Sequence, residues 1–337
     1  MSKIYEALRQ AELDRAKSSV AESETDQPAT GQNAPDSGQT PGYPSGVRTL
    51  AAVLPVARAM GDKAPVTPIA DLKISATDVA DTALETAAID LASVPQIDWA
   101  PSIHQLPALE ERGSSVEQFR SLRSRMQEFR DLNALKSILV SSGLPQEGKS
   151  FIAVNLAISF ARHKAGRVLL IDGDMRRATL HKLLGCPQGP GLTEYLSGDA
   201  SIAKIMQRPG PGDDDHPLPH GLASLTFIPA GTEHDKAADL SGNRRFERLI
   251  VSAAPHFDWI VVDSSPVNLV SDGVNLARAC DAVLLVARGG VTKYESAQRA
   301  LGELKASKVL GFVLNAVRNP PVAGGYYGYD GYDKIEE

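Results

Sequence analysis

A glycine-rich run followed by a lysine and a serine is the part of this chain best suited to phosphate chemistry. The run GLPQEGKS, residues 143–150, fits the pattern G-x-x-x-x-G-K-[ST] at every fixed position. Glycines let backbone N–H groups turn inward around phosphate oxygens, while the lysine reaches the β and γ phosphates and the serine hydroxyl ligates Mg²⁺. The run predicts a nucleoside triphosphate site, and a coincidental glycine turn is the alternative.

Carboxylates are the second requirement of a nucleotide–magnesium site, and two apolar segments of the chain end in them. RVLLIDGDMRR carries Asp172 and Asp174, and DWIVVDSSP carries Asp263. An aspartate that ends a buried strand lies beside the phosphate loop of a parallel sheet, where it can hold the water shell of the metal. Each aspartate alone could be a turn former, but three such positions with a complete loop favour a shared site.

The elements that must position these residues follow from short aliphatic runs that alternate with helical stretches. The runs are almost continuously apolar, as strands covered on both faces must be. Helices of mixed polarity are expected around 149–163, 244–253 and 292–306. The expected strands are 137–142, 167–172, 225–230, 258–263, 282–287 and 311–316. The alternation predicts an α/β fold with a doubly wound, mostly parallel sheet that binds ligands at the carboxyl ends of its strands.

A further helix is expected just before the first of these strands, over residues 114–132. Ser114 and Glu117 have the spacing of a capping box. Apolar side chains follow at steps of three and four and predict that the helix packs on a core. They are Val116, Phe119, Leu122, Met126 and Phe129.

The first 95 residues and the last 17 have compositions unlike the rest of the chain. A short helix is expected within 1–16, and a disordered linker over 17–95, which is rich in small and polar residues. The nucleotide-binding domain is expected over 100–320, and a flexible tyrosine-rich tail over 321–337. This tail holds four of the chain's eight tyrosines, Tyr326, Tyr327, Tyr329 and Tyr332.

Composition excludes some classes of protein. A formal net charge of −6 argues against non-specific nucleic-acid binding. Cys186 and Cys280 lie far apart without metal-ligand spacing, as expected of thiols in a reducing compartment. No stretch approaches 18 consecutive apolar residues, and the N-terminus has no apolar signal-peptide core, so we expect a cytoplasmic protein.

Together, GLPQEGKS, LLIDGDMRR and WIVVDSSP resemble the Walker A, Walker A′ and Walker B motifs of the bacterial tyrosine kinases of capsule and exopolysaccharide loci. EQFRSLR, residues 117–123, is similar to the E-x-x-R-x-x-R motif that those kinases use for oligomer contacts. The opening MSKIYEAL resembles a subgroup encoded in exosortase-linked polysaccharide loci. The resemblance runs from about residue 114 to the C-terminus and implies a P-loop fold related to the ParA/MinD ATPases.

The resemblance implies transfer of the γ-phosphoryl group of ATP to the tail tyrosines, in trans within a homo-oligomer. Asp172 is the expected base, with Asp174 a further support of the metal, and an exchange of these two roles is the alternative. The expected Mg²⁺ ligands are Ser150, Asp172 and Asp263. Asn315 is expected to contact the nucleotide base. The other expected nucleotide contacts are Gly143, Gln146, Glu147, Gly148, Lys149, Ser150 and Phe151.

The resemblance also implies partners. Glu117, Arg120 and Arg123 are expected to form one polar face for a neighbouring subunit, with a solvated face as the alternative. The sequence shows no fused transmembrane segments of the kind some relatives carry. A separate Wzz-like inner-membrane co-polymerase is therefore the expected activator and would hold the protein at the membrane, and a tyrosine phosphatase would reverse the reaction.

The chain departs from related proteins at three places, and the first bears on the alternative function, a ParA/MinD-like ATPase. ParA/MinD ATPases carry a signature lysine where this chain has Leu144, which weighs against a ParA/MinD-like positioning ATPase without protein phosphorylation. Ala178 replaces a usual proline and Ser264–Ser265 a usual threonine–proline pair, but neither change removes a phosphate or metal ligand. The loop 210–221 is unusually rich in Asp and His, and a solvated surface loop is favoured over a metal site.

Overall fold

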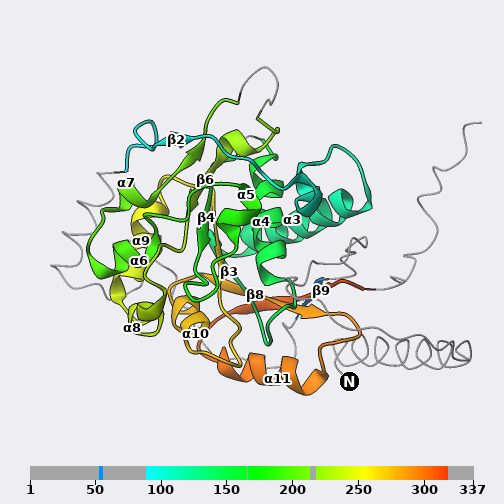
Figure 1. Cartoon of the computed structure of the whole chain (residues 1–337). Coiled ribbons are helices and arrows are strands. Elements are labelled where there is room, and N and C mark those ends of the chain that lie inside the picture. Colours follow the sequence, from blue (N-terminus) through cyan, green and yellow to red (C-terminus); the bar gives the residue numbers. More distant parts are fainter. Residues whose placement is uncertain (1–52, 56–88, 165, 213–217, 318–337) are drawn as a thin grey trace, which may run out of the picture.

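The computed structural model describes residues 53–55, 89–164, 166–212 and 218–317. Its centre is a sheet of seven strands in the order β1-β9-β8-β3-β7-β4-β6, parallel throughout except for the antiparallel β1–β9 pair (Figure 1). The strands are β1 (Val53–Pro55), β3 (Ser137–Ser142), β4 (Val168–Asp172), β6 (Leu225–Ile228), β7 (Trp259–Asp263), β8 (Ala282–Arg288) and β9 (Val309–Asn315). The predicted doubly wound, mostly parallel fold is confirmed.

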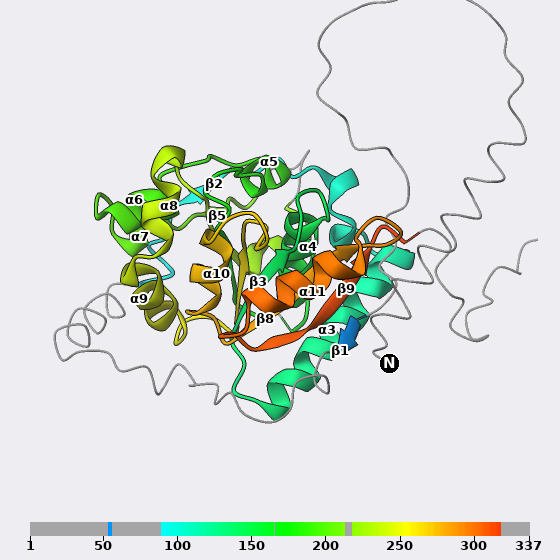
Figure 2. The same cartoon turned by 90° about the horizontal axis from the view of Figure 1, so that it is seen from below.

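Helices cover both faces of the sheet, with α3, α4 and α5 on one face and α6 to α11 on the other. In the view from below, α11 runs across β8 and β9 (Figure 2). The helices are α3 (Ser114–Leu132), α4 (Lys149–Ala161), α5 (Leu180–Leu184), α6 (Leu192–Ser197), α7 (Ile202–Ile205), α8 (Ala237–Ser241), α9 (Arg244–Ala253), α10 (Asp272–Ala277) and α11 (Tyr294–Glu303). A small parallel pair, β2 (Gln96–Ile97) and β5 (Arg208–Pro209), lies beside this body, together with short 3₁₀ turns such as η3 (Pro107–Leu109).

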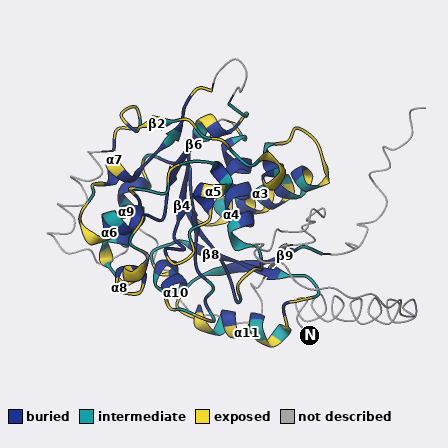
Figure 3. Cartoon of the chain, in the orientation of Figure 1, coloured by how far each residue is buried: buried dark blue, intermediate teal, exposed yellow. Residues whose placement is uncertain are grey.

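The strands are buried on both faces (Figure 3). Successive side chains of a strand point to opposite faces and pack into two separate hydrophobic cores. In β3, Ile138 and Val140 pack with α3 and α4, whereas Leu139 packs with the helices of the opposite face. This explains why the strands read as continuous apolar runs in the sequence.

Helix α4 follows the phosphate loop and is buried along almost its whole length, from Phe151 to Ala161. The two polar residues of this buried stretch have partners. Asn155 Oδ1 accepts the Ala108 backbone N–H at 3.0 Å, and Ser159 Oγ donates to the Phe119 carbonyl at 3.3 Å. These bonds fix η3 and α3 onto α4, so the loop that precedes α4 stands on a rigid base.

Two expectations require correction. The capping box of α3 is absent, since the N-cap position is Gly113 and no side chain caps it. The linker expected over 17–95 is structured in two places. Val53–Pro55 pairs with β9, and residues 89–95 carry Ile89 and Val94, which are 5% and 4% exposed and belong to a core.

Other expectations concern residues that the structure does not describe. The helix within 1–16, the remaining linker and the tail of 321–337 with its four tyrosines lie outside the described residues. The same holds for residues 213–217 of the loop 210–221.

Candidate functional site

The phosphate loop joins β3 to α4 and is held open by a glycine that no other residue could replace without strain. Gly148 is the N-cap of α4 with φ 98°, a left-handed conformation that favours glycine. A Cβ added to it would lie 1.9 Å from Asn315 Nδ2. That amide donates to the Glu147 carbonyl at 2.9 Å, so the end of β9 and the loop lie in direct contact.

Glu147 fixes the loop from inside. Its side chain is 3% exposed, and one carboxylate oxygen accepts the Leu144 backbone N–H at 2.8 Å. The other accepts the hydroxyl of Thr292, which in turn accepts the Arg288 backbone N–H at 2.8 Å. Burial raises the pKa of Glu147, while these hydrogen bonds oppose the rise. These contacts make Glu147 a latch between the loop and the 288–292 segment. Its expected nucleotide contact stays a prediction.

Lys149 lies among the three predicted aspartates. Its Nζ is 2.7 Å from Asp174 Oδ2, 3.9 Å from Asp263 Oδ2 and 3.1 Å from Ser150 Oγ. Desolvation alone would lower the pKa of Lys149, but the charges of Asp263 and Asp174 outweigh it and raise the pKa. The ammonium therefore stays charged where phosphate oxygens would have to be neutralised.

Asp172 ends β4 opposite Asp263, which ends the neighbouring strand β7, and both are fully buried. Asp172 Oδ2 accepts the N–H groups of Thr179 and Leu180 at 3.2 and 3.1 Å, whereas Oδ1 has a single long contact, 3.3 Å, to the Asp174 N–H. Desolvation, followed by the charge of Asp263, raises the pKa of Asp172 to about 8. This carboxylate therefore holds a proton far more readily than an ordinary aspartate.

Several buried polar atoms around the loop lack a hydrogen-bond partner among the described residues. They include both carboxylate oxygens of Asp263, Ser265 Oγ, Asn268 Oδ1 and Asn315 Oδ1. Desolvation raises the pKa of Asp263 to about 6 in spite of Lys149 and Ser150, which both lower it. Buried polar groups are costly without partners, so this edge of the sheet fits a strongly polar ligand.

The chemistry of the donor set suits a magnesium nucleotide. In the described part of the chain, no group of three or more His, Cys, Asp and Glu side chains is arranged as a metal site. Mg²⁺ does not need one, since it keeps several waters and binds through one or two carboxylates together with phosphate oxygens. Ser150 Oγ and the Asp263 carboxylate stand where such an ion would be held beside the loop.

Some residues differ from their expected place. Phe151 is 7% exposed and its ring packs edge-on against Phe119 in the core. Its expected nucleotide contact stays a prediction. Asn268 and Thr292 were not predicted as site residues. Asn268 follows β7 and Thr292 follows β8, and neither belongs to a recognisable sequence motif. An added Cβ on Gly143 would lie 2.9 Å from Asn268 Nδ2, which places this amide against the first loop glycine.

The polar face expected of α3 is incomplete. Glu117 and Arg120 form an exposed ion pair, but Arg123 turns inward and donates to the Ser159 carbonyl at 3.0 Å. Steps of three residues drift by about 60° each, so two steps carry Arg123 about 120° from Glu117 and onto the α4 side. The three residues thus differ in exposure, and their oligomer role (Glu117, Arg120 and Arg123) stays a prediction.

A phosphate loop between a buried strand and a helix, with aspartates at the ends of adjacent strands, defines a P-loop nucleotide-binding α/β protein. No family model matches the chain. Among curated proteins it is 30% identical over 223 residues to tyrosine-protein kinase YwqD of Bacillus subtilis, covering 65% of this chain and 89% of that protein. It is 31% identical to tyrosine-protein kinase CpsD of Streptococcus agalactiae, covering 91% of that protein. The chain thus belongs to the family of bacterial tyrosine-protein kinases.

Solved structures agree with this family. The kinase domain of Escherichia coli tyrosine kinase ETK superposes with a TM-score of 0.58 at 27% identity, over 67% of this chain and 85% of that one. The BceF tyrosine kinase domain gives 0.53 at 28% identity, over 71% and 90%. Some relatives are much longer, and the chain spans 29% of tyrosine-protein kinase wzc from Salmonella typhimurium, to which it is 30% identical. The resemblance to the exosortase-linked subgroup stays a prediction.

Proposed function

We propose that this protein is a protein-tyrosine autokinase that transfers the γ-phosphoryl group of ATP to tyrosines of its own C-terminal tail. One observation carries the proposal: in a member of the tyrosine-protein kinase family, Lys149 and three buried aspartates converge at a complete phosphate loop. The acceptors we propose are Tyr326, Tyr327, Tyr329 and Tyr332, which lie outside the described residues.

The residues of the site divide into groups by what they would hold. The loop N–H groups and Lys149 would bind the phosphates of ATP, and Asn315, with its unpartnered Oδ1, would meet the nucleotide base. Ser150, Asp172 and Asp263 would hold Mg²⁺, directly or through its waters, and the ion would neutralise phosphate charge. Lys149 is now paired with Asp174, so phosphate oxygens would have to compete with that carboxylate for the ammonium.

Asp172 is the proposed proton acceptor. A tyrosine hydroxyl has a pKa near 10, so a nearby base assists its attack on phosphorus. The pKa of Asp172 is raised to about 8, and its Oδ1 is less engaged than its Oδ2. The phosphorus–oxygen bond to ADP would break as the tyrosine oxygen bonds to phosphorus, and the phenolic proton would pass to Asp172. Asp174 would release Lys149 to the phosphates and support the metal.

The setting of the reaction is part of the proposal. A tail would enter the site of a neighbouring copy, so phosphorylation would occur in trans within a homo-oligomer that uses Glu117, Arg120 and Arg123. Among the described residues no helix is long and apolar enough to cross a bilayer. As part of the same proposal, the protein attaches to the inner membrane through a Wzz-like co-polymerase and controls exopolysaccharide or capsule polymerisation and export, and its phosphorylation is reversed by a tyrosine phosphatase.

The test uses the purified full chain with ATP, Mg²⁺ and a cytoplasmic peptide of the proposed co-polymerase, read by mass spectrometry of the C-terminal peptide. We expect phosphotyrosine in residues 326–332, none in Lys149→Met, and most of it lost when all four tail tyrosines become Phe while ATP binding persists. ATP hydrolysis with nucleotide-dependent dimerisation and no phosphotyrosine would instead favour the ParA/MinD-like switch. Loss of turnover without loss of ATP affinity in Asp172→Asn would support its role as base.

A further inference from the structure

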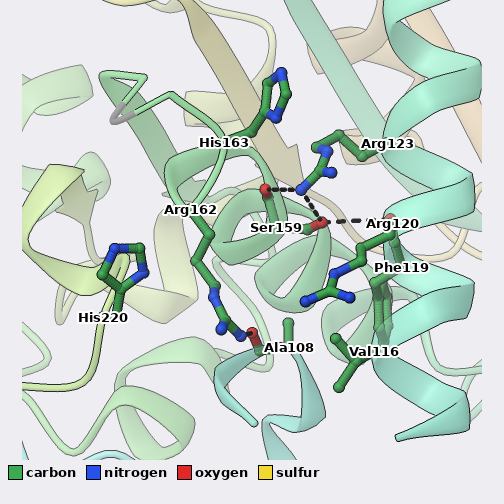
Figure 4. A pocket seen from close by; sticks show the side chains of 9 residues that line it. All are labelled: Ala108, Val116, Phe119, Arg120, Arg123, Ser159, Arg162, His163 and His220. Atoms are coloured by element: carbon green, nitrogen blue, oxygen red, sulfur yellow. Dashed lines mark hydrogen bonds between the residues drawn. The ribbon is translucent and has the colours of Figure 1, made fainter. Parts of the chain in front are cut away.

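A second polar pocket lies at the opposite end of α4 from the phosphate loop. It has a volume of about 320 Å³ and is lined by Arg120 and Arg123 of α3, by Arg162 and His163 just after α4, and by His220 (Figure 4). Ser159, also in its wall, follows Lys149 by ten residues, which corresponds to about 15 Å along the helix axis. The pocket is therefore separate from the nucleotide site.

The charges in this pocket are of one sign. Three guanidinium groups and two imidazoles line it, and no carboxylate does. Glu117 is paired with Arg120 on the exposed side of α3. Burial, then the charges of Arg120 and Arg162, lowers the pKa of Arg123, and only Glu117 opposes them. Glu117 offsets only part of this repulsion, and like charges held together are costly, so a bound anion would reduce that cost.

Hydrogen bonds to the protein hold the Arg123 and Arg162 side chains in place but do not use all of their N–H donors. Arg123 donates through Nη1 to Ser159, while its Nε is buried without a partner in the described part of the chain. Arg162 donates through Nη1 to the carbonyls of Ala108 and Glu110. Figure 4 shows Arg120 and Arg162 pointing into the same space from two sides. Such anchored guanidinium forks suit the oxygens of a phosphate monoester.

The floor of the pocket is apolar and adds a second requirement. Val116 and Phe119 of α3 and Ala108 of η3 form it. Each of these three residues is at most 3% exposed, so the apolar floor is small. A phosphate monoester with an apolar part next to its charge would match both the arginines and this floor.

We infer that this pocket binds phosphotyrosine, and that its occupant is the phosphorylated tail of a second copy of this chain. Phosphotyrosine joins an aromatic ring to a charge near −2. The tail contains Tyr329, with Asp330 and Asp333 close by to add negative charge. The source of the phosphate rests on the proposed function, whereas binding by the pocket does not. A phosphorylated tail bound in this pocket would lie at the other end of α4 from the phosphate loop of the chain that binds it. The reaction product would thus stay bound without blocking that nucleotide site.

The experiment measures binding of two fluorescent synthetic peptides of residues 324–337, one phosphorylated at Tyr329 and one not. The receptor is the full chain with its four tail tyrosines changed to Phe, without ATP, so the result does not depend on kinase activity. We expect the phosphopeptide to bind at least about tenfold more tightly, and Arg120→Gln to remove at least about tenfold of that affinity, the scale of one charge-assisted hydrogen bond. Arg125→Gln, exposed on α3 outside the pocket, should leave binding unchanged.

Two outcomes would overturn the inference. Equal affinity for both peptides would mean that the tail carboxylates, not phosphate, are recognised. Equal loss in Arg120→Gln and Arg125→Gln would mean that the general charge of α3, not this pocket, attracts the peptide. Circular dichroism of each variant checks its fold, and Arg120→Lys, which keeps the charge but not the fork, should lose an intermediate amount.

Discussion

The latch made by Glu147 predicts a link between the 288–292 segment and nucleotide binding. In Thr292→Val the Glu147 carboxylate loses a hydroxyl donor inside the protein, and the Arg288 N–H loses its acceptor. A hydrogen bond to a charged group contributes about 1.5–3 kcal/mol. If a latch bond worth about 2 kcal/mol is all that keeps the loop in its binding geometry, its loss weakens ATP binding by up to about thirtyfold.

The assay is ATP affinity by isothermal titration in Mg²⁺, together with thermal denaturation of each variant. Thr292→Ser keeps the hydroxyl and should bind ATP like the parent. Glu147→Gln retains an acceptor for the Leu144 N–H and should lose less affinity than Glu147→Ala. Glu303, an exposed glutamate of α11, provides the control, and Glu303→Ala should change neither quantity.

A double-mutant cycle decides whether the two residues act together. The double variant Glu147→Gln with Thr292→Val should lose less affinity than the sum of the single losses, because both changes break the same bond. Additive losses, or variants whose melting temperature falls while ATP affinity stays within twofold of the parent, would show that Glu147 stabilises the fold without setting the loop geometry.

Three further perturbations concern the site and the helix that follows its phosphate loop. Gly148→Ala should abolish ATP binding, because its Cβ would overlap Asn315, whereas Gly302→Ala in the open part of α11 should be tolerated; titration and melting of both variants check this. Asp172 has a folded pKa of about 8 against 3.8, so its contribution to stability is full below about pH 4 and is lost as pH rises toward 8. With a metal chelator present, the melting temperature of Asp172→Asn should therefore rise relative to that of the parent as the pH increases from 5 to 8. A difference in melting temperature that does not change with pH would contradict this. Asn155→Leu leaves a buried N–H of η3 without its acceptor and should cost about 1–3 kcal/mol in urea unfolding.

The sequence predicted those parts of the site that depend on local patterns. Continuous apolar runs located β3, β4 and β7, and the carboxyl ends of parallel strands necessarily brought Asp172 beside Asp263. What it could not predict were contacts between residues distant in the chain. Thr292 reaches Glu147 across 145 positions, and no local spacing records such a contact. The inward turn of Arg123 depended on where α4 packs, which helical periodicity alone does not specify.

The two polar sites stand at the two ends of one buried helix, and this placement limits how they can influence each other. Helix α4 directs its N-terminal N–H groups at the phosphate loop, where partial positive charge favours phosphate, and its C-terminal carbonyls toward Arg123. Asn155 and Ser159 tie the same helix to η3 and α3, the elements that supply the floor of the arginine pocket. A ligand can couple two sites only if it favours one of two arrangements, and a helix packed on all sides offers little room for a second one. We therefore expect the phosphopeptide to leave ATP affinity unchanged, so that the pocket acts through where it holds a neighbour's tail.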